Sequence, residues 1–454
     1  MKKELFSNEI TILRDTFRRL LRRRAKTNII KLIDKTHPAD LALLFRYFNE
    51  NEQDEIFNDL KPSADTAEFL NELDESISIR LLENESPERI AQILEYASSN
   101  EQAHLMGLVD DKYASSVIDL LKAEKQEELE EMMAYPEDSA GILMYTDVFT
   151  LHEDTKAKDA IYALQDQEDA EMVFYLYTLD NDGRLTGVIS LRDLVTTSGD
   201  TMLKDIMSKQ IHVVRPETDQ EEVARIVSQY NFLAVPVVDS DDHLLGIVTV
   251  EDVVDIIREE ATEDFLQMVG AGKDREILLK SSWENARMRV PWLFASWVGG
   301  ILAVFIIGVF DNVLQSTIAL AAFIPVIMGM GGNIGTQSST MIVRGLATGR
   351  VSIENSVKIL FKEIRVGLLL GILYGLLLGL FAIFQFIDAS PMIGIVVGLS
   401  ICISMIIAAT IGSLVPLILN RFEIDPAIAT GPFVTTAIDI IGVAFYFIVA
   451  GAFL

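Results

Sequence analysis

A single aspartate stands in the middle of the last apolar stretch of the chain, where a charged side chain is unexpected. Asp439 lies within GPFVTTAIDIIGVAF and is the only acid in the interior of the apolar runs that follow Arg289. An ionised Asp at the centre of a membrane helix costs about 2.5–3.5 kcal/mol, so it normally faces a cavity or a partner. Because 366–420 and 422–454 contain no Lys or Arg, we expect a water-filled path or a cation beside it. The alternative is a protonated Asp that is hydrogen-bonded inside a helix bundle.

The residues just before Asp439 could supply further oxygen ligands. Gly431, Pro432, Thr435 and Thr436 precede it by one to two helical turns and offer backbone or hydroxyl oxygens. One carboxylate per chain suits an ion that keeps most of its water, and Mg²⁺ is such an ion because it dehydrates reluctantly. Two copies of the chain around one axis would place two Asp439 carboxylates on the same ion.

A second unusual run, MGMGGNIGTQSST, follows Pro325 inside another apolar segment. It is too polar and too rich in glycine for a helix that faces lipid. Irregular backbone at membrane depth is tolerated where it lines a water-filled cavity or is buried in protein. We therefore predict that 325–340 lines a pore. The predicted lining residues here and before Asp439 are Gly329, Gly332, Asn333, Thr336, Gly431 and Thr435.

Both motifs belong to a series of five apolar segments, each of which reaches the ~20 residues that a helix needs to cross a bilayer. The segments are 291–310, 317–343, 366–387, 391–419 and 427–454. Basic residues precede the first segment, gather in the loop 344–365 and recur at Arg421. The positive-inside rule then places the N-terminus in the cytoplasm and the C-terminus outside. The alternative, a very apolar soluble core, would leave the protein without a polar surface.

Charge divides the 454 residues into two unlike parts. Residues 291–454 hold six basic and seven acidic side chains, whereas 27–290 carry a net charge near −34 and 1–26 hold nine basic and three acidic side chains. The acidic body excludes nucleic acid as a partner, because phosphate binding needs a basic surface. One cysteine, Cys402, excludes a disulfide framework. We find no phosphate loop or nucleophile–base set, so we predict that the chain is not an enzyme.

The soluble part contains an internal repeat. Residues 175–195 and 234–254 each show a strand, an Asp-rich turn, a second strand and a helix capped by Ser or Thr, and Asp193 matches Asp252 at an offset of 59. This tandem pattern resembles a pair of CBS domains over about 141–260. CBS pairs usually bind adenine nucleotides or other small ligands, which nominates Asp193, Arg192, Tyr175 and Phe232 as binding residues. The alternative is a plain dimerisation module in which the Asp only caps a helix.

Acidic and basic helices surround the repeat. Short amphipathic helices over 27–135 predict a superhelix of helix pairs. The helix 251–265 places acids at i, i+3 and i+4, where like charges repel, so it is either a screened solvated face or a site for divalent cations. The basic stretch Arg14–Lys26 is either a solvated helix face resting on acidic surface or a contact to lipid headgroups.

Taken together, these parts resemble the MgtE family of magnesium channels and transporters. MGGNIGTQSS and DPAIATGPFVTTAID are the most specific motifs, and the resemblance covers essentially the whole chain. It implies a homodimer with an ion path between subunits, in which Asp439 is the selectivity carboxylate beside backbone near Gly332 and Thr435. It also implies ATP in the CBS cleft. The implied Mg²⁺ ligands are Asp439, Asp425, Glu68, Asp219, Asp252, Asp255, Glu260, Glu263 and Asp264.

Some positions depart from the family pattern. Asn100, Glu101 and His104 stand where we would expect an acidic pair or triple on the N-terminal domain, and Asn231 stands where another carboxylate would help. Thr336 replaces a common Asn in the pore motif. Sensing of Mg²⁺ by the soluble part is therefore expected to be weaker or redistributed.

The sequence thus predicts a multidomain membrane protein. Its parts are a basic helix (1–26), an acidic, all-α superhelical N-domain (27–140), tandem α/β CBS domains (141–204 and 205–262), a long connecting or plug helix (263–290) and a five-helix transmembrane pore domain (291–454). We expect a homodimer in the cell membrane that admits Mg²⁺ and is closed by cytosolic Mg²⁺, with ATP as a further ligand. The alternatives are uptake of Co²⁺ or Mn²⁺, and a membrane-anchored nucleotide sensor.

Overall fold

The computed structural model describes residues 2–166, 174–271, 277, 280–352, 355–387, 390–422, 424–429 and 431–454, with side chains from residue 10 onward. The chain divides into two compact units, Met1–Ile257 and Arg258–Leu454. Each unit is described by itself below.

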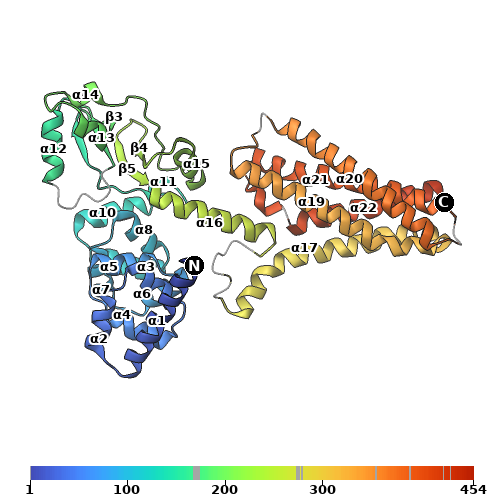
Figure 1. The fold of residues 1–454 in the computed structure, drawn as a ribbon, viewed down its shortest axis with the longest axis horizontal. Coiled ribbons are helices and arrows are strands. Elements are labelled where there is room, and N and C mark those ends of the chain that lie inside the picture. Colours follow the sequence, from blue (N-terminus) through green and yellow to red (C-terminus); the bar gives the residue numbers. More distant parts are fainter. Residues whose placement is uncertain are drawn as a thin grey trace. The chain divides into compact units, whose positions relative to one another are not determined.

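The first unit begins with ten helices (Figure 1). They are α1 (Lys2–Arg22), α2 (Lys26–Ile33), α3 (Pro38–Phe45), α4 (Glu50–Asp59), α5 (Ala64–Asn71), α6 (Glu75–Glu83), α7 (Pro87–Leu94), α8 (Ser99–Gly107), α9 (Asp111–Ile118) and α10 (Ala123–Met132). Helices α2 to α10 are short, so they depend on their neighbours for stability. Their starts are encoded locally: Asn49 with Glu52 and Ser98 with Glu101 form capping boxes, and Pro87 opens α7.

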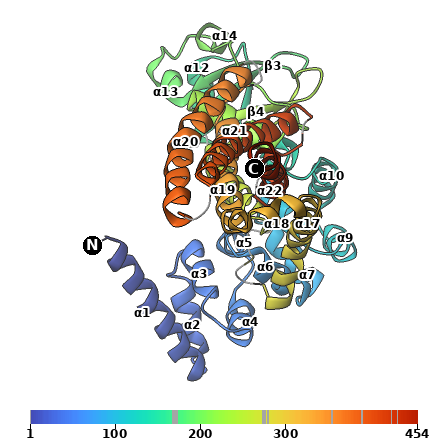
Figure 2. The ribbon, with the colours of Figure 1, turned by 90° about the vertical axis from the view of Figure 1, so that its right-hand side faces the viewer.

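One apolar core runs through these helices. Its largest side chains include Phe17, Phe45 and Phe69, which are fully buried. The rings of Phe45 and Phe69 meet edge to face at 4.8 Å, which joins α3 to α5. The expected chain of short helices is therefore present. Only α1 reaches outward, with its N-terminal end leading away from α3 and α4 (Figure 2).

The two repeats follow. Their elements are α11 (Ala140–Leu143), β1 (Thr150–His152), α12 (Ala157–Gln165), β2 (Tyr175–Leu179), β3 (Leu185–Ser190), α13 (Leu191–Thr196), α14 (Leu203–Ile206), α15 (Gln220–Tyr230), β4 (Ala234–Val238) and β5 (Leu244–Thr249). Strand β1 pairs with β2 in parallel, whereas β2–β3 and β4–β5 are antiparallel hairpins. The hairpins shift register at equivalent positions, between Thr178 and Leu179 and between Val237 and Val238. The internal repeat read from the sequence is therefore a structural repeat.

Helix α16 (Val250–Met268) leaves the last strand and crosses from the first unit into the second. The connecting segment 263–290 is not one helix, because the chain turns at Gly270, which has a φ of +70°, and the next helix starts at Ser282. Glycine adopts positive φ without steric cost, so this turn ends α16. Part of the predicted helix, 272–276 and 278–279, lies outside the described residues.

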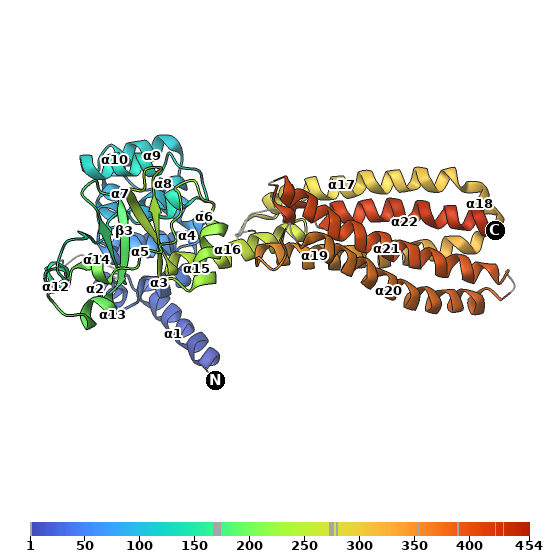
Figure 3. The ribbon, with the colours of Figure 1, turned by 90° about the horizontal axis from the view of Figure 1, so that it is seen from above.

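The second unit is a bundle of long helices that run side by side (Figure 3). Its elements are α17 (Ser282–Val309), α18 (Asp311–Ser316), η1 (Ile318–Phe323), α19 (Ile324–Ala347), α20 (Ser356–Gln385), α21 (Met392–Arg421), η2 (Pro426–Ala429) and α22 (Gly431–Phe453). Five stretches in the described residues are long and apolar enough to span a membrane, as expected from the sequence. Helix α19 is continuous over 325–340, so the glycines of this run do not interrupt it.

Small residues bring the bundle helices close together. Gly367, Gly371, Gly375 and Gly379 of α20 lie against the backbone of α21, and Gly412 of α21 lies against the backbone of Gly335 in α19. Without a hydrophobic drive between helices in lipid, such close packing supplies much of the stability of a bundle. The four-residue glycine stripe of α20 is therefore a packing seam.

Replacing Gly375 with Ala should destabilise the bundle by about 1–3 kcal/mol. A Cβ atom at Gly375 would lie 2.5 Å from the carbonyl oxygen of Gly398, so the two helices must separate. Gly308→Ala is the matched control, because a Cβ there meets nothing within 4 Å. Thermal inactivation of the detergent-solubilised protein, followed by size-exclusion chromatography, measures the difference. Equal stability of the two variants would show that the seam is loose.

Candidate functional site

Asp439 lies on α22 against the glycine-rich face of α19. A Cβ atom at Gly332 would lie 3.9 Å from Oδ1 of Asp439 and 3.8 Å from Cγ2 of Thr435. The carboxylate is half-buried, and no hydrogen bond or ion pair joins it to any described residue. Gly332 therefore leaves room beside a carboxylate that has no hydrogen-bonding partner in the part of the chain that the structure describes.

The predicted lining residues of α19 share one side of the helix. Gly329 and Asn333 are exposed and Gly332 and Thr336 are half-buried, whereas Ile327, Gly331, Ile334, Gly335 and Ser338 are buried. Although α19 is regular rather than irregular, the predicted lining residues therefore lie together on a face that the single chain leaves open. On α22, Thr435 donates a hydrogen bond from Oγ1 to the carbonyl oxygen of Gly431 at 3.0 Å.

The end of α16 packs on the start of α22. A Cβ at Gly270 would lie 3.0 Å from Cγ of Pro432, and one at Gly431 would lie 2.5 Å from the carbonyl oxygen of Met268. Two predicted ligands lie near this junction. Burial, with Asp425 and Glu260 nearby, raises the pKa of Asp264 to about 6. Asp425, at the turn before η2, accepts a hydrogen bond from the backbone amide of Ala427 at 2.8 Å.

The sequence analysis missed a second buried carboxylate, Glu363 on α20. Its side chain is 5% exposed, and its Oε2 accepts a hydrogen bond from Oγ of Ser338 on α19 at 3.0 Å. This bond ties the lining helix to its neighbour. The residue escaped notice because it lies three positions before the predicted apolar run, inside the basic loop 344–365.

Three of the predicted nucleotide residues, Tyr175, Arg192 and Asp193, lie at the end of the first hairpin. Tyr175 pairs with Ser190 across β2 and β3. Oγ of Ser190 caps α13 by accepting from the backbone amide of Asp193 at 3.1 Å, and it donates to Oδ2 of Asp193 at 2.7 Å. Arg192 and Asp193 are exposed. Phe232 precedes β4 and stacks on Tyr230 at 5.3 Å.

His212 extends this aromatic stack and was not predicted. Its ring lies 4.1 Å from that of Tyr230 and 5.5 Å from that of Phe232. The two repeats of the first unit therefore carry an acidic side chain (Asp193), a basic side chain (Arg192) and several aromatic rings, among them Tyr175, Phe232 and His212.

Asp252 occupies the position equivalent to Asp193 but in a different environment. Oγ1 of Thr249, the residue before α16, donates to Oδ2 of Asp252 at 2.5 Å, and Nδ2 of Asn100 on α8 donates to Oδ1 at 3.3 Å. Burial raises the pKa of Asp252 to about 6, despite the opposing effect of the Thr249 hydrogen bond. One copy of the repeat therefore presents its Asp to solvent, and the other copy holds its Asp against the N-domain.

The remaining predicted ligands do not converge. Glu68 lies 3.9 Å from His37, Asp219 caps α15 at the amide of Glu221, and Asp255 is exposed on α16. Glu263 is half-buried and accepts a hydrogen bond from Gln267 at 2.9 Å. Within the described residues, no group of three or more His, Cys, Asp or Glu side chains could hold a metal ion.

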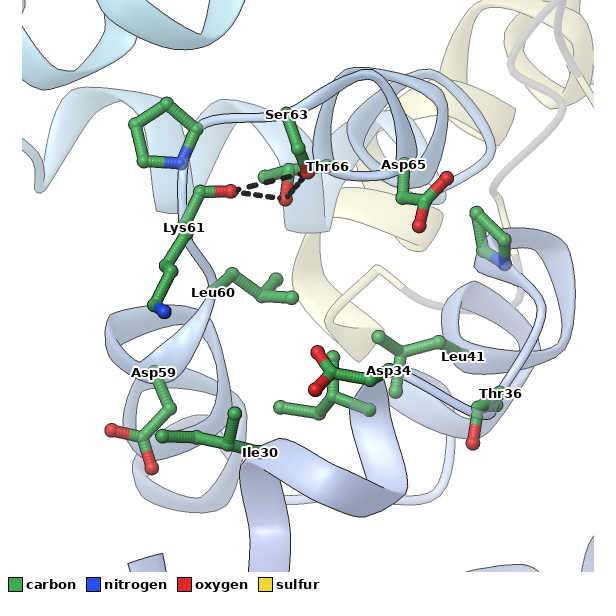
Figure 4. Close-up of a pocket in the computed structure, with 13 residues that line it drawn as sticks. Ile30, Asp34, Thr36, Leu41, Asp59, Leu60, Lys61, Ser63, Asp65 and Thr66 are labelled. Atoms are coloured by element: carbon green, nitrogen blue, oxygen red, sulfur yellow. Dashed lines mark hydrogen bonds between the residues drawn. The ribbon is translucent and has the colours of Figure 1, made fainter. Parts of the chain in front are cut away.

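A cavity of about 320 Å³ in the N-domain lies apart from these residues (Figure 4). Asp34, Asp59 and Asp65 line it together with apolar side chains such as Leu41 and Leu60. Asp59 is paired with Lys26 at 2.6 Å. None of the predicted site residues lines this cavity, so it is not part of the candidate site.

Comparison with known proteins decides what the bundle is. Residues 324–449 match the MgtE family of divalent cation transporters, 36–138 match the MgtE intracellular N domain, and 140–199 and 203–259 match CBS domains. Magnesium transporter MgtE of Bacillus subtilis is 31% identical over 424 residues, which are 93% of this chain and 93% of the relative. The chain belongs to the MgtE family. Magnesium transporter MgtE of Thermus thermophilus is 35% identical over 92% of this chain and 94% of its own length.

Solved structures support the same assignment for the soluble part. The soluble part of a magnesium transporter is 30% identical with a TM-score of 0.50, and it matches 56% of this chain and 99% of its own. The cytosolic domain of the Mg²⁺ channel MgtE in complex with ATP is 33% identical with a TM-score of 0.51, over 54% and 99%. The predicted fold class is confirmed. As a member of the MgtE family the chain is a membrane transporter and not an enzyme, as predicted.

Asp252→Asn should strengthen the contact between α8 and the second repeat at pH 7 in metal-free buffer. Folding raises the pKa of Asp252, so the folded protein holds this proton more tightly than the unfolded chain does. The contact therefore loses stability as the pH rises from about 4 to about 6, and the whole loss is present above pH 6. The gain should be at most about 3 kcal/mol. Hydrogen exchange of α8 amides in the full chain, corrected for intrinsic rates, measures it. Asp193→Asn is the matched control, and an equal effect there would contradict this assignment.

Proposed function

We propose that this chain is a homodimeric Mg²⁺ transporter whose ion path runs beside Asp439 in the cell membrane. The observation that carries the proposal is the half-buried carboxylate of Asp439, which faces the space left by Gly332 and has no hydrogen-bonding or basic partner among the described residues. A bare carboxylate at bilayer depth is costly unless water or a cation accompanies it. The curated relatives named as magnesium transporters support Mg²⁺ as that cation.

The open face of α19 supports a pore between two copies. Gly329, Asn333 and Thr336 are poorly suited to lipid, yet a single chain leaves their side of the helix uncovered. A second copy related by a two-fold axis would cover this face and bring two Asp439 carboxylates to one path. Two carboxylates with water and backbone oxygens suit a hydrated Mg²⁺ ion, which keeps several of its waters when bound.

The orientation follows from charge. Arg344, Arg350, Lys358, Lys362 and Arg365 lie in one loop, and Arg421 lies in another that faces the same side. We place this side and the acidic N-terminal part in the cytoplasm, and the C-terminus outside.

Cytosolic Mg²⁺ closes the path in this proposal. The carboxylates of the N-domain, the CBS pair and α16 repel one another at low Mg²⁺, and the proposed regulatory ligands are Glu68, Asp219, Asp252, Asp255, Glu260, Glu263, Asp264 and Asp425. Mg²⁺ would bind better to a compact arrangement and shift the population toward it. The packing of α16 on Gly431 and Pro432 supports a plug, because these residues start the helix that carries Asp439.

ATP is the proposed second ligand of the soluble part. Tyr175 and Phe232 offer aromatic rings, Arg192 offers a cation for phosphate, and Asp193 offers an acceptor for ribose hydroxyls. The ATP complex of the related cytosolic domain supports this assignment.

Asp439→Asn should reduce Mg²⁺ uptake by about a hundredfold or more, since an intramembrane carboxylate at this position stabilises the ion on its path. Mg²⁺ flux into liposomes that contain the purified full chain measures this directly. Asp311→Asn is the control, because Asp311 is exposed at the end of an apolar segment. Normal flux through the Asp439 variant would remove Asp439 from the ion path, and flux of Co²⁺ or Mn²⁺ in preference to Mg²⁺ would change the assigned cargo.

Replacing Asp264 and Asp425 with Ala should weaken closure by Mg²⁺ without abolishing flux. The two carboxylates are close enough to raise the pKa of Asp264, so their removal eliminates both the repulsion and the proposed shared ion. The concentration of internal Mg²⁺ that halves the flux should rise about tenfold. Glu251→Gln, on an exposed position of the same helix, is the control. An unchanged Mg²⁺ threshold in the double variant would exclude these residues from the gate.

A further inference from the structure

The N-terminal segment carries a charge opposite to that of the rest of the soluble part. Residues 2–26, here called the basic arm, comprise α1 and the turn after it and hold nine of the basic side chains with three acids. The following residues to position 290 have a net charge near −34. A strongly basic segment attracts anionic surfaces, whereas the acidic rest of the soluble part repels them.

The C-terminal half of α1 is held firmly on the N-domain. Phe17 is fully buried and Leu21 nearly so, and both belong to the core of the first unit. Arg18 donates a hydrogen bond to the carbonyl oxygen of Tyr47 and lies over the ring of Phe48. The arm is therefore an anchored helix whose opposite side has a fixed direction relative to its domain (Figures 2 and 3).

That opposite side is a stripe of arginines. Arg19, Arg22 and Arg23 are exposed and follow one another at helical spacing, and none forms an ion pair with a described residue. Two nearby acids have other partners, since Glu52 pairs with Arg18 and Asp59 pairs with Lys26. Arginines in the last turn of a helix interact favourably with the helix dipole. Each such interaction contributes only tenths of a kcal/mol, so the dipole alone does not explain three outward guanidinium groups.

An exposed apolar side chain lies on the same stripe. Ile12 is 66% exposed and precedes Arg19 by two helical turns. A surface of carboxylates would gain from the arginines but not from this isoleucine. A bilayer surface gains from both, because anionic headgroups attract the guanidinium groups and the boundary with the acyl chains accepts the apolar side chain.

We propose that the arginine stripe (Arg19, Arg22 and Arg23) with Ile12 docks on anionic lipid headgroups of the membrane that holds the same chain. The spanning helices of the second unit keep this surface at high effective concentration, so a weak contact is sufficient. The acidic remainder of the soluble part is repelled by the same headgroups, which makes the arm its point of attachment. The proposal goes beyond transport and uses only the membrane location of the proposed function.

The test places the full chain in nanodiscs of phosphatidylcholine, with or without about 30% phosphatidylglycerol. Cys402 is replaced by Ala, Thr11 is replaced by Cys, and an environment-sensitive fluorophore is attached there. Spin-labelled lipids then quench the fluorophore only if the arm lies on the bilayer. A fluorophore at Leu120→Cys, an exposed position of the N-domain, is the control and should not be quenched.

We expect quenching at position 11 in anionic nanodiscs at about 0.15 M salt and its loss at about 1 M salt, where charges are screened beyond ~3 Å. Replacing the three arginines with Gln should lower the docked fraction about tenfold or more, and replacing them with Lys should preserve it. Absence of quenching in anionic lipid, equal quenching in pure phosphatidylcholine, or no effect of the Gln variant would overturn the proposal. Because nanodiscs have the same lipids on both faces and flux is not measured, failure here is distinct from failure of the transport proposal.

Discussion

The cost of a carboxylate at bilayer depth governs the design of the membrane unit. Asp439 has no basic side chain to pair with, because the apolar segments around it contain no Lys or Arg. The fold instead gives it space, since Gly332 on α19 leaves a gap where any larger residue would place a side chain against the carboxylate. The same helix must also approach α21 and α22 closely at Gly335, so glycine serves two purposes along α19. One set of small residues closes the bundle, and one of them, Gly332, leaves space beside the carboxylate.

The soluble unit shows how one repeat can yield two different sites. Asp193 and Asp252 are equivalent, and each accepts a hydrogen bond from the Ser or Thr hydroxyl that precedes its helix. The first remains exposed beside Arg192 and is available to a ligand. The second is covered by Asn100 of α8 and carries a raised pKa, so its charge is buried at a domain contact. A neutral amide there makes the contact without a cation, which is consistent with the expectation that sensing is redistributed in this chain.

Sequence reasoning succeeded where a residue contrasts with its local surroundings. Asp439 stands out against apolar neighbours, and the two hairpins repeat with the same spacing of Asp residues. It failed where the decisive partner is distant or the contrast is lost. Glu363 sits in a basic loop that conceals it, and the bond between Asn100 and Asp252 joins residues 152 positions apart. The glycine-rich run of α19 remains a regular helix, because packing in the bundle stabilises helices that contain glycine.

Charge ultimately links the two units. Divalent cations reduce repulsion between carboxylates of the soluble part, and the same carboxylates are repelled by an anionic membrane surface. An attachment through the basic arm would oppose the repulsion between the soluble part and the membrane surface at one place only. The soluble part would then be attached at two points, the basic arm and helix α16. Salt screens the exposed arginines of the basic arm more than it screens buried contacts such as that of Asp252. A rise in ionic strength should therefore weaken the contact between the arm and the membrane more than the contacts inside the soluble part.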